Sequence, residues 1–104
     1  MSKEINPKIV NEGRIIWQHH ALKRMLERDI GRKDVKKVLI EGEILESYPD
    51  DHPLPSFLIF GRDSNKNPLH VVAALDMLAD WCYIITVYRP NKSHFKDDFK
   101  TRIK

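Results

Sequence analysis

Cysteine is almost absent from this sequence of 104 residues, in which Cys82 stands alone. A single cysteine cannot form a disulfide within the chain, so a small disulfide-stabilised scaffold is excluded. Cys82 lies in the apolar run DWCYIITVY, whereas a reactive thiol needs an electropositive and partly exposed setting. We therefore expect a buried, reduced thiol.

Long apolar stretches are absent as well. The sequence has no run of about 18 apolar residues, so it offers no transmembrane helix. Its first residues, MSKEINPKIVNEG, lack the apolar stretch of a signal peptide. These two absences predict a cytoplasmic protein without a membrane partner.

The motifs of several enzyme classes are also missing. The histidines and the cysteine show no CxxC or HxxxH spacing, which argues against a zinc site. Neither a glycine-rich phosphate loop nor a GxSxG nucleophile motif occurs. We expect no metal and no other cofactor.

What the sequence does have is charge. Charged residues make up 32% of the chain, the net charge is +3 and the pI is about 9.1. This mildly basic balance is compatible with a nucleic-acid partner. A hydrophobic fraction of 41% suits one domain over residues 1–104 with a modest core.

The first part of the chain has helical periodicity. Apolar residues spaced by three and four predict helices over residues 4–12, 19–29 and 33–41, and RIIW predicts a short extended segment. Each predicted helix is followed by a glycine that would end it: Gly13, Gly31 and Gly42.

From residue 43 onward, β-branched and aromatic runs predict strands. The predicted strands cover residues 43–49, 56–62, 69–75 and 81–89. Short connections between consecutive strands favour antiparallel pairing. The predicted fold is an α+β domain, with N-terminal helices packed on an antiparallel sheet of about four strands. Residues 92–104 follow as a charged tail, whose apolar residues have the spacing of an amphipathic helix.

Loop lengths predict which strand residues lie opposite one another. If DSNKN is a five-residue hairpin loop, Phe60 pairs with His70. If MLADW is another, Asp76 pairs with Cys82 and His70 with Tyr88. A change of one residue in either loop would turn a strand over.

Side-chain alternation then assigns the two faces of the sheet. The odd-numbered face is the more apolar and is expected to pack on the helices; it holds Phe57, Ile59, Leu69, Val71, Ala73, Leu75, Ile85 and Val87. The even-numbered face gathers Arg62, His70 and Tyr88 at one end of three neighbouring strands.

A second polar group lies on the predicted helix 19–29. His20, Arg24 and Arg28 are four residues apart and form one row, although like charges at this spacing repel each other. The row is either ordinary surface, with Glu27 forming simple ion pairs, or it faces something anionic.

These residue types suit cleavage of RNA without a metal. The reaction needs a base for the proton of the 2′-hydroxyl, cations for the phosphate and an acid for the leaving oxygen. Histidine suits both proton transfers because its unperturbed pKa is about 6.5, and arginine donates paired hydrogen bonds to phosphate. The candidate catalytic residues are His20, His70, Arg24 and Tyr88. The candidate phosphate-binding residues are Arg28, Arg62 and Arg89, with Glu27 as an orienting residue.

Each candidate also has an ordinary structural explanation. His20, near the start of a helix, can be a capping or half-buried residue. His70, inside an apolar strand, can be a hydrogen-bonded core histidine. Arg24 and Arg28 can belong to a solvated helix face.

Four blocks of the sequence resemble a known family: HHALKRMLERDI, EGEILESYPDDHPLPSFLIFG, PLHVVAAL and IITVYRP. In order and spacing, over about residues 17–91, they resemble the domain of unknown function DUF4258. That family is similar to the RelE-like toxins of the barnase–EndoU–colicin E5–RelE (BECR) group, which are small α+β ribonucleases that act without a metal. The resemblance implies RNA as substrate and a cognate antitoxin as protein partner.

The family pattern His-Ala-x-x-Arg-Met-x-x-Arg falls on His20, Arg24 and Arg28. Its strand histidine falls on His70, and its closing Tyr-Arg-Pro begins at Tyr88. Two positions depart from the pattern: the additional His19, and Asp29, where a glycine is expected.

The sequence therefore supports a leading hypothesis and two alternatives. The leading one is a toxin-like, metal-independent ribonuclease of a toxin–antitoxin system. The first alternative is a non-catalytic module of the same fold that binds nucleic acid or protein. The second is an interaction domain whose histidines are structural.

Overall fold

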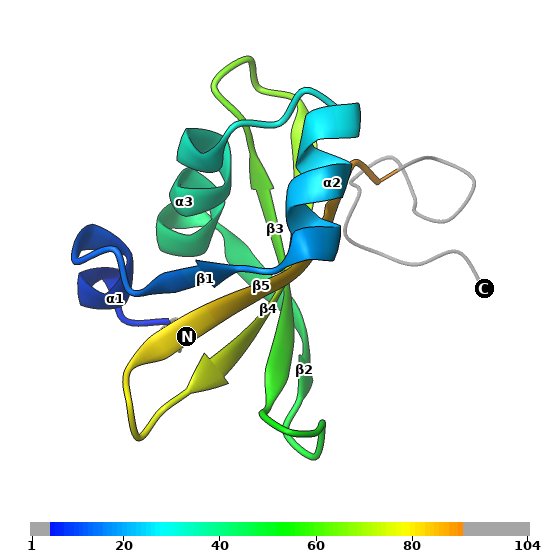
Figure 1. The fold of residues 1–104 in the computed structure, drawn as a ribbon. Coiled ribbons are helices and arrows are strands. Elements are labelled where there is room, and N and C mark those ends of the chain that lie inside the picture. The colour runs from blue at the N-terminus through cyan, green and yellow to red at the C-terminus, as the bar shows by residue number, and fades with distance from the viewer. Residues whose placement is uncertain (1–4, 91–104) are drawn as a thin grey trace.

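A five-stranded sheet lies at the centre of the part of the chain that the computed structural model describes, residues 5–90. Its strand order is β1-β5-β4-β3-β2 (Figure 1). The strands are β1 (Ile15–Trp17), β2 (Glu43–Tyr48), β3 (Ser56–Arg62), β4 (Pro68–Asp76) and β5 (Trp81–Tyr88). The helices are α1 (Pro7–Asn11), α2 (His19–Glu27) and α3 (Arg32–Glu41). The predicted charged tail, 92–104, lies outside the described residues.

The α+β class is confirmed, but the predicted sheet is wrong in two respects. The short segment Ile15–Trp17 is a fifth strand and pairs in parallel with β5, so the sheet is mixed. Because β1 separates α1 from α2, the helices do not simply precede the strands. The amide of Cys82 donates to the carbonyl of Arg14 at 3.0 Å, and the amide of Gln18 donates to Ile84 at 3.3 Å. These bonds satisfy backbone amide and carbonyl groups along the edge of β5 that β1 covers.

Helix α2 ends earlier than predicted, at Glu27 rather than residue 29. Asp29 adopts a left-handed conformation with φ of 54°, and the amide of Ile30 donates to the carbonyl of Met25 at 2.8 Å. This is the Schellman arrangement that closes a helix C-terminus. Gly31 is therefore not the terminator that the sequence predicted, and instead occupies the N-cap of α3. Gly42 ends α3 as predicted.

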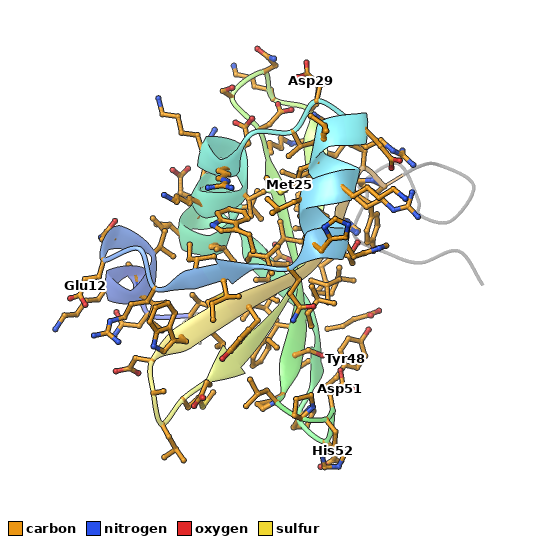
Figure 2. All side chains as sticks on the ribbon, viewed as in Figure 1. Glu12, Met25, Asp29, Tyr48, Asp51 and His52 are labelled. Carbon is orange, nitrogen blue, oxygen red and sulfur yellow. The ribbon has the colours of Figure 1, made fainter. Side chains whose placement is uncertain are left out.

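The core lies between the helices and one face of the sheet. On β3 and β4 the predicted odd-numbered residues are all buried there: Phe57, Ile59, Leu69, Val71, Ala73 and Leu75. Met25 points into this core from α2 (Figure 2). Cys82 is fully buried, as predicted, and burial raises the pKa of its thiol to about 12.

The register of β4 and β5 shows why one face assignment is wrong. His70 pairs with Tyr88 as predicted, but Asp76 pairs with Trp81 and not with Cys82, because the connecting turn has four residues and not five. A bulge in β5 at Ile85 restores the predicted register beyond Val72. As a result Ile84, rather than Ile85, is buried in the core.

Helices α1 and α3 lie beside each other on one side of the sheet, and α2 packs on β5 (Figure 1). We call the face turned away from α1 and α3 the second face. No helix between residues 5 and 90 is long and apolar enough to cross a bilayer.

Candidate functional site

Three aromatic rings from neighbouring strands meet on the second face. Nδ1 of His70 lies 3.2 Å from the Tyr88 hydroxyl oxygen, and the two ring centroids are 5.2 Å apart. Phe60 approaches His70 edge-on, with centroids 5.8 Å apart. The predicted pairings of β3, β4 and β5 therefore bring these residues together. His70 is fully buried and Tyr88 is half-buried.

Arg62 borders this cluster, as the predicted faces of the sheet required. Its guanidinium carbon lies 5.5 Å from the centroid of the Phe60 ring. Its Nη1 donates to the carbonyl of Lys66 at 3.0 Å. The side chain is exposed, so it combines a cation–π contact with access to solvent.

The guanidinium group of Arg89 is bound by two other parts of the chain. Its Nη2 lies 2.9 Å from Oδ2 of Asp63, and its Nη1 donates to the carbonyl of Pro68 at 3.3 Å. The Asp63 side chain is only 3% exposed. Its Oδ1 accepts the amides of Asn65 and Asn67, each at 2.9 Å. Arg89 thus ties the end of β5 to the loop between β3 and β4.

The balance of forces on Asp63 favours its charged form. Burial by itself raises the pKa of this carboxyl group. The amide of Asn67, the Arg89 guanidinium and the amide of Asn65 outweigh burial, so the pKa of Asp63 lies below its ordinary value of 3.8.

The predicted row on α2 is exposed: His20, Arg24 and Arg28 all lie at the surface. Nη1 of Arg24 is 3.3 Å from Oε1 of Glu27, and both side chains are 44% exposed. A surface pair of this kind contributes about 0.3–0.5 kcal/mol. Glu27 therefore contacts Arg24 at the surface, and the Arg24 side chain keeps its access to solvent.

The structure separates the two predicted histidines by environment. His70 lies inside the aromatic cluster of the second face, whereas His20 lies at the surface near the start of α2. Their segments are linked through β5, because α2 packs on this strand and Tyr88 is its last residue. Within residues 5–90, no group of three His, Cys, Asp or Glu side chains is placed to hold a metal.

Two features were missed at the level of sequence. One is the buried Asp63, whose position at the start of the DSNKN loop is typical of an aspartate that bonds nearby amides. The other is a pocket formed by Gln18, residues 51–54, Ala74, Tyr83 and Ile85. The only sequence signal for this pocket is the stretch of prolines and aspartates between the strands predicted over 43–49 and 56–62.

Comparison with known proteins identifies one family. The model of the family described as "Domain of unknown function (DUF4258)" matches residues 17–89, which include α2, all of β2 to β5 and the residues of the aromatic cluster. No curated protein and no solved structure matches the chain.

Proposed function

Because this chain belongs to the DUF4258 family, whose description names no activity, we propose a function from its own residues: metal-independent cleavage of RNA. The observation that carries the proposal is the arrangement around β5. Exposed His20 and Arg24 lie on α2, which packs on β5, and exposed Arg28 is the C-cap of this helix. Half-buried Tyr88 is the last residue of β5.

In the proposed reaction His20 accepts the proton of a 2′-hydroxyl. The 2′-oxygen attacks the neighbouring phosphorus, the bond from phosphorus to the 5′-oxygen breaks, and the products are a 2′,3′-cyclic phosphate and a 5′-hydroxyl. Arg24 and Arg28 bind the phosphate and stabilise the charge that develops on it. Arg24 lies in the last turn of α2 and Arg28 is its C-cap residue, so both guanidinium groups are available at this end of the helix for backbone phosphates.

Tyr88 supplies the proton to the leaving 5′-oxygen. Full burial removes His70 from contact with RNA, so we assign it the positioning of the Tyr88 hydroxyl through their hydrogen bond of 3.2 Å. Arg62, exposed beside the cluster, extends the cationic surface. Arg89 supports the same edge through its pair with Asp63.

Membership of the RelE-like, BECR-type group is part of this proposal. It rests on the residue pattern around His20, Arg24 and His70. It carries with it a cytoplasmic RNA substrate and an antitoxin partner that covers the basic row.

Incubation of the folded protein with RNA in EDTA tests the proposal. The expected result is a cyclic phosphate product from RNA and no cleavage at positions where the 2′-hydroxyl is replaced by hydrogen. Intact RNA after incubation with protein of native melting temperature would overturn the catalytic claim.

The burial of His70 favours one second candidate, a module that binds RNA without cutting it. Of the two predicted catalytic histidines only His20 is exposed, so the row offers a single proton-transfer histidine beside two phosphate-binding arginines. Its signature is RNA affinity that falls steeply as salt rises, with no cleavage.

A further inference from the structure

A pocket on the second face lies at the N-terminal end of α2. Its volume is about 360 Å³, within the range of small-molecule sites. Ala74, Tyr83 and Ile85 form its floor, residues 51–54 form a wall, and Gln18 lines its edge. Figure 2 shows Asp51 and His52 at the opposite end of the molecule from Asp29, which follows the C-terminus of α2.

The sheet itself gives the pocket an apolar and aromatic floor. Tyr83 pairs with Ala74 across β5 and β4. Ile84 points into the core, so its neighbours Tyr83 and Ile85 both face the pocket. A flat ring that enters this space meets one aromatic and two aliphatic side chains.

Asp51, His52 and Gln18 are the polar side chains that line the pocket. Ser56 Oγ donates to Oδ2 of Asp51 at 2.6 Å, and the amide of Asp51 donates to the carbonyl of Tyr48 at 3.2 Å. These contacts orient the carboxylate and leave Oδ1 for a ligand. The side chain of Gln18 makes no capping hydrogen bond to α2, so its amide can serve the pocket.

We propose that this pocket binds a nucleobase of RNA, with preference for bases that carry an amino group. The inference rests on the proposed function for the choice of RNA as ligand. An apolar and aromatic floor stacks on the face of a base, and a carboxylate accepts a hydrogen bond from an amino group such as cytosine N4. Uracil has no amino group and carries the carbonyl O4 where cytosine carries its N4 amino group, so it offers Asp51 fewer hydrogen-bond donors than the other bases.

The position of the pocket fits the proposed phosphate row. Gln18 lines the pocket, and His20 follows two residues later at the start of α2. A base in the pocket therefore directs its ribose and phosphate toward His20 and, one turn further on, Arg24. The pocket selects the base and the row binds the backbone.

Titration of the ¹⁵N-labelled full chain with CMP, AMP, GMP and UMP tests the inference. Saturable shifts are expected at the amides of Ala74, Tyr83 and Ile85, with UMP the weakest ligand. Asp51→Asn should weaken binding of CMP, AMP and GMP about tenfold, as expected for loss of a hydrogen bond to a charged group, and bring them close to UMP. Gln18→Ala, at an exposed position without a capping bond, should weaken binding as well.

Asp50→Asn is the matched control, because Asp50 is an exposed neighbour that does not line the pocket; it should bind like the wild type. Absence of pocket shifts with all four nucleotides, or equal affinities for them in the wild type, would overturn the inference. If RNA is cleaved and no nucleotide shifts the amide signals of the pocket, the proposed function stands and the pocket inference fails. If the pocket discriminates between bases and RNA is never cleaved, the reverse holds.

Discussion

Arg89 and Asp63 form an ion pair, with Nη2 2.9 Å from Oδ2, that joins the end of β5 to the β3–β4 loop. The pair lies beside Pro68, which begins β4, and so stabilises the three strand ends that carry Phe60, His70 and Tyr88.

Replacement of Arg89 by methionine should therefore destabilise the protein. The substitution leaves Asp63 buried with only its amide hydrogen bonds, and we expect a loss of about 1–3 kcal/mol in the free energy of unfolding. Urea denaturation measures it. Arg62→Met, at an exposed position, is the control and should cost less than about 0.5 kcal/mol. Equal stability of the two variants would show that the pair is not structural.

Asp63 should also make stability depend on acid. Its folded pKa lies below the ordinary value of 3.8, so its contribution is fully present above that value. The contribution is lost as pH falls through the folded pKa. Denaturation from roughly pH 5 to pH 2 should show Asp63→Asn to be less stable than the wild type at the upper end. The gap should narrow as pH falls, and a constant gap would contradict this account.

Asp29→Gly should stabilise the protein. Asp29 has φ of 54° at the end of α2, a conformation that glycine adopts without a Cβ penalty. The left-handed conformation costs an L-residue roughly 1–2 kcal/mol, and the greater chain entropy of glycine offsets part of the relief. We expect a net gain of up to about 1 kcal/mol, measured as a higher melting temperature. Arg28→Gly provides the contrast, since Arg28 has φ of −107° and gains nothing from glycine. A lower melting temperature for Asp29→Gly would refute the strain argument.

Cys82 should be unreactive in the folded protein. The thiol is fully buried and its pKa is raised to about 12. At neutral pH a reagent therefore cannot reach the sulfur, and the sulfur is not present as the reactive thiolate. A disulfide reagent such as Ellman's should modify it only after denaturation. Rapid stoichiometric reaction under native conditions would show that β5 opens readily.

The sequence was sufficient for the presence of the three helices, though not for the end of α2, and for the pairing of β3 with β4, because periodicity determines the helices and a five-residue loop determines the pairing. It predicted RIIW as a short extended segment but did not place it in the sheet as β1, since three residues carry little periodicity and their partner, β5, is distant in the chain. The β4–β5 prediction placed His70 opposite Tyr88 only because the bulge at Ile85 compensated for a turn one residue shorter than expected. A run of β-branched and aromatic residues gives no sequence signal for the position of a bulge.

The candidate site was predictable in its residue types and less so in their exposure. The spacing of His20, Arg24 and Arg28 implied a common row, and all three are exposed. The sequence left open whether His70 is a core histidine or a site histidine, because alternation predicts a face and not what covers it. The pocket near Asp51 depends on how a loop folds over the sheet, which composition does not determine.

The central claim is that the exposed His20 is the base in cleavage of RNA. The most direct test compares the rates of cleavage in EDTA for the wild type, His20→Ala and Lys23→Ala, an exposed change on the same helix outside the row. We predict that His20→Ala is slower by about 10²- to 10⁴-fold at an unchanged melting temperature, and that Lys23→Ala cleaves at the wild-type rate. Cleavage by His20→Ala at the wild-type rate would contradict the account.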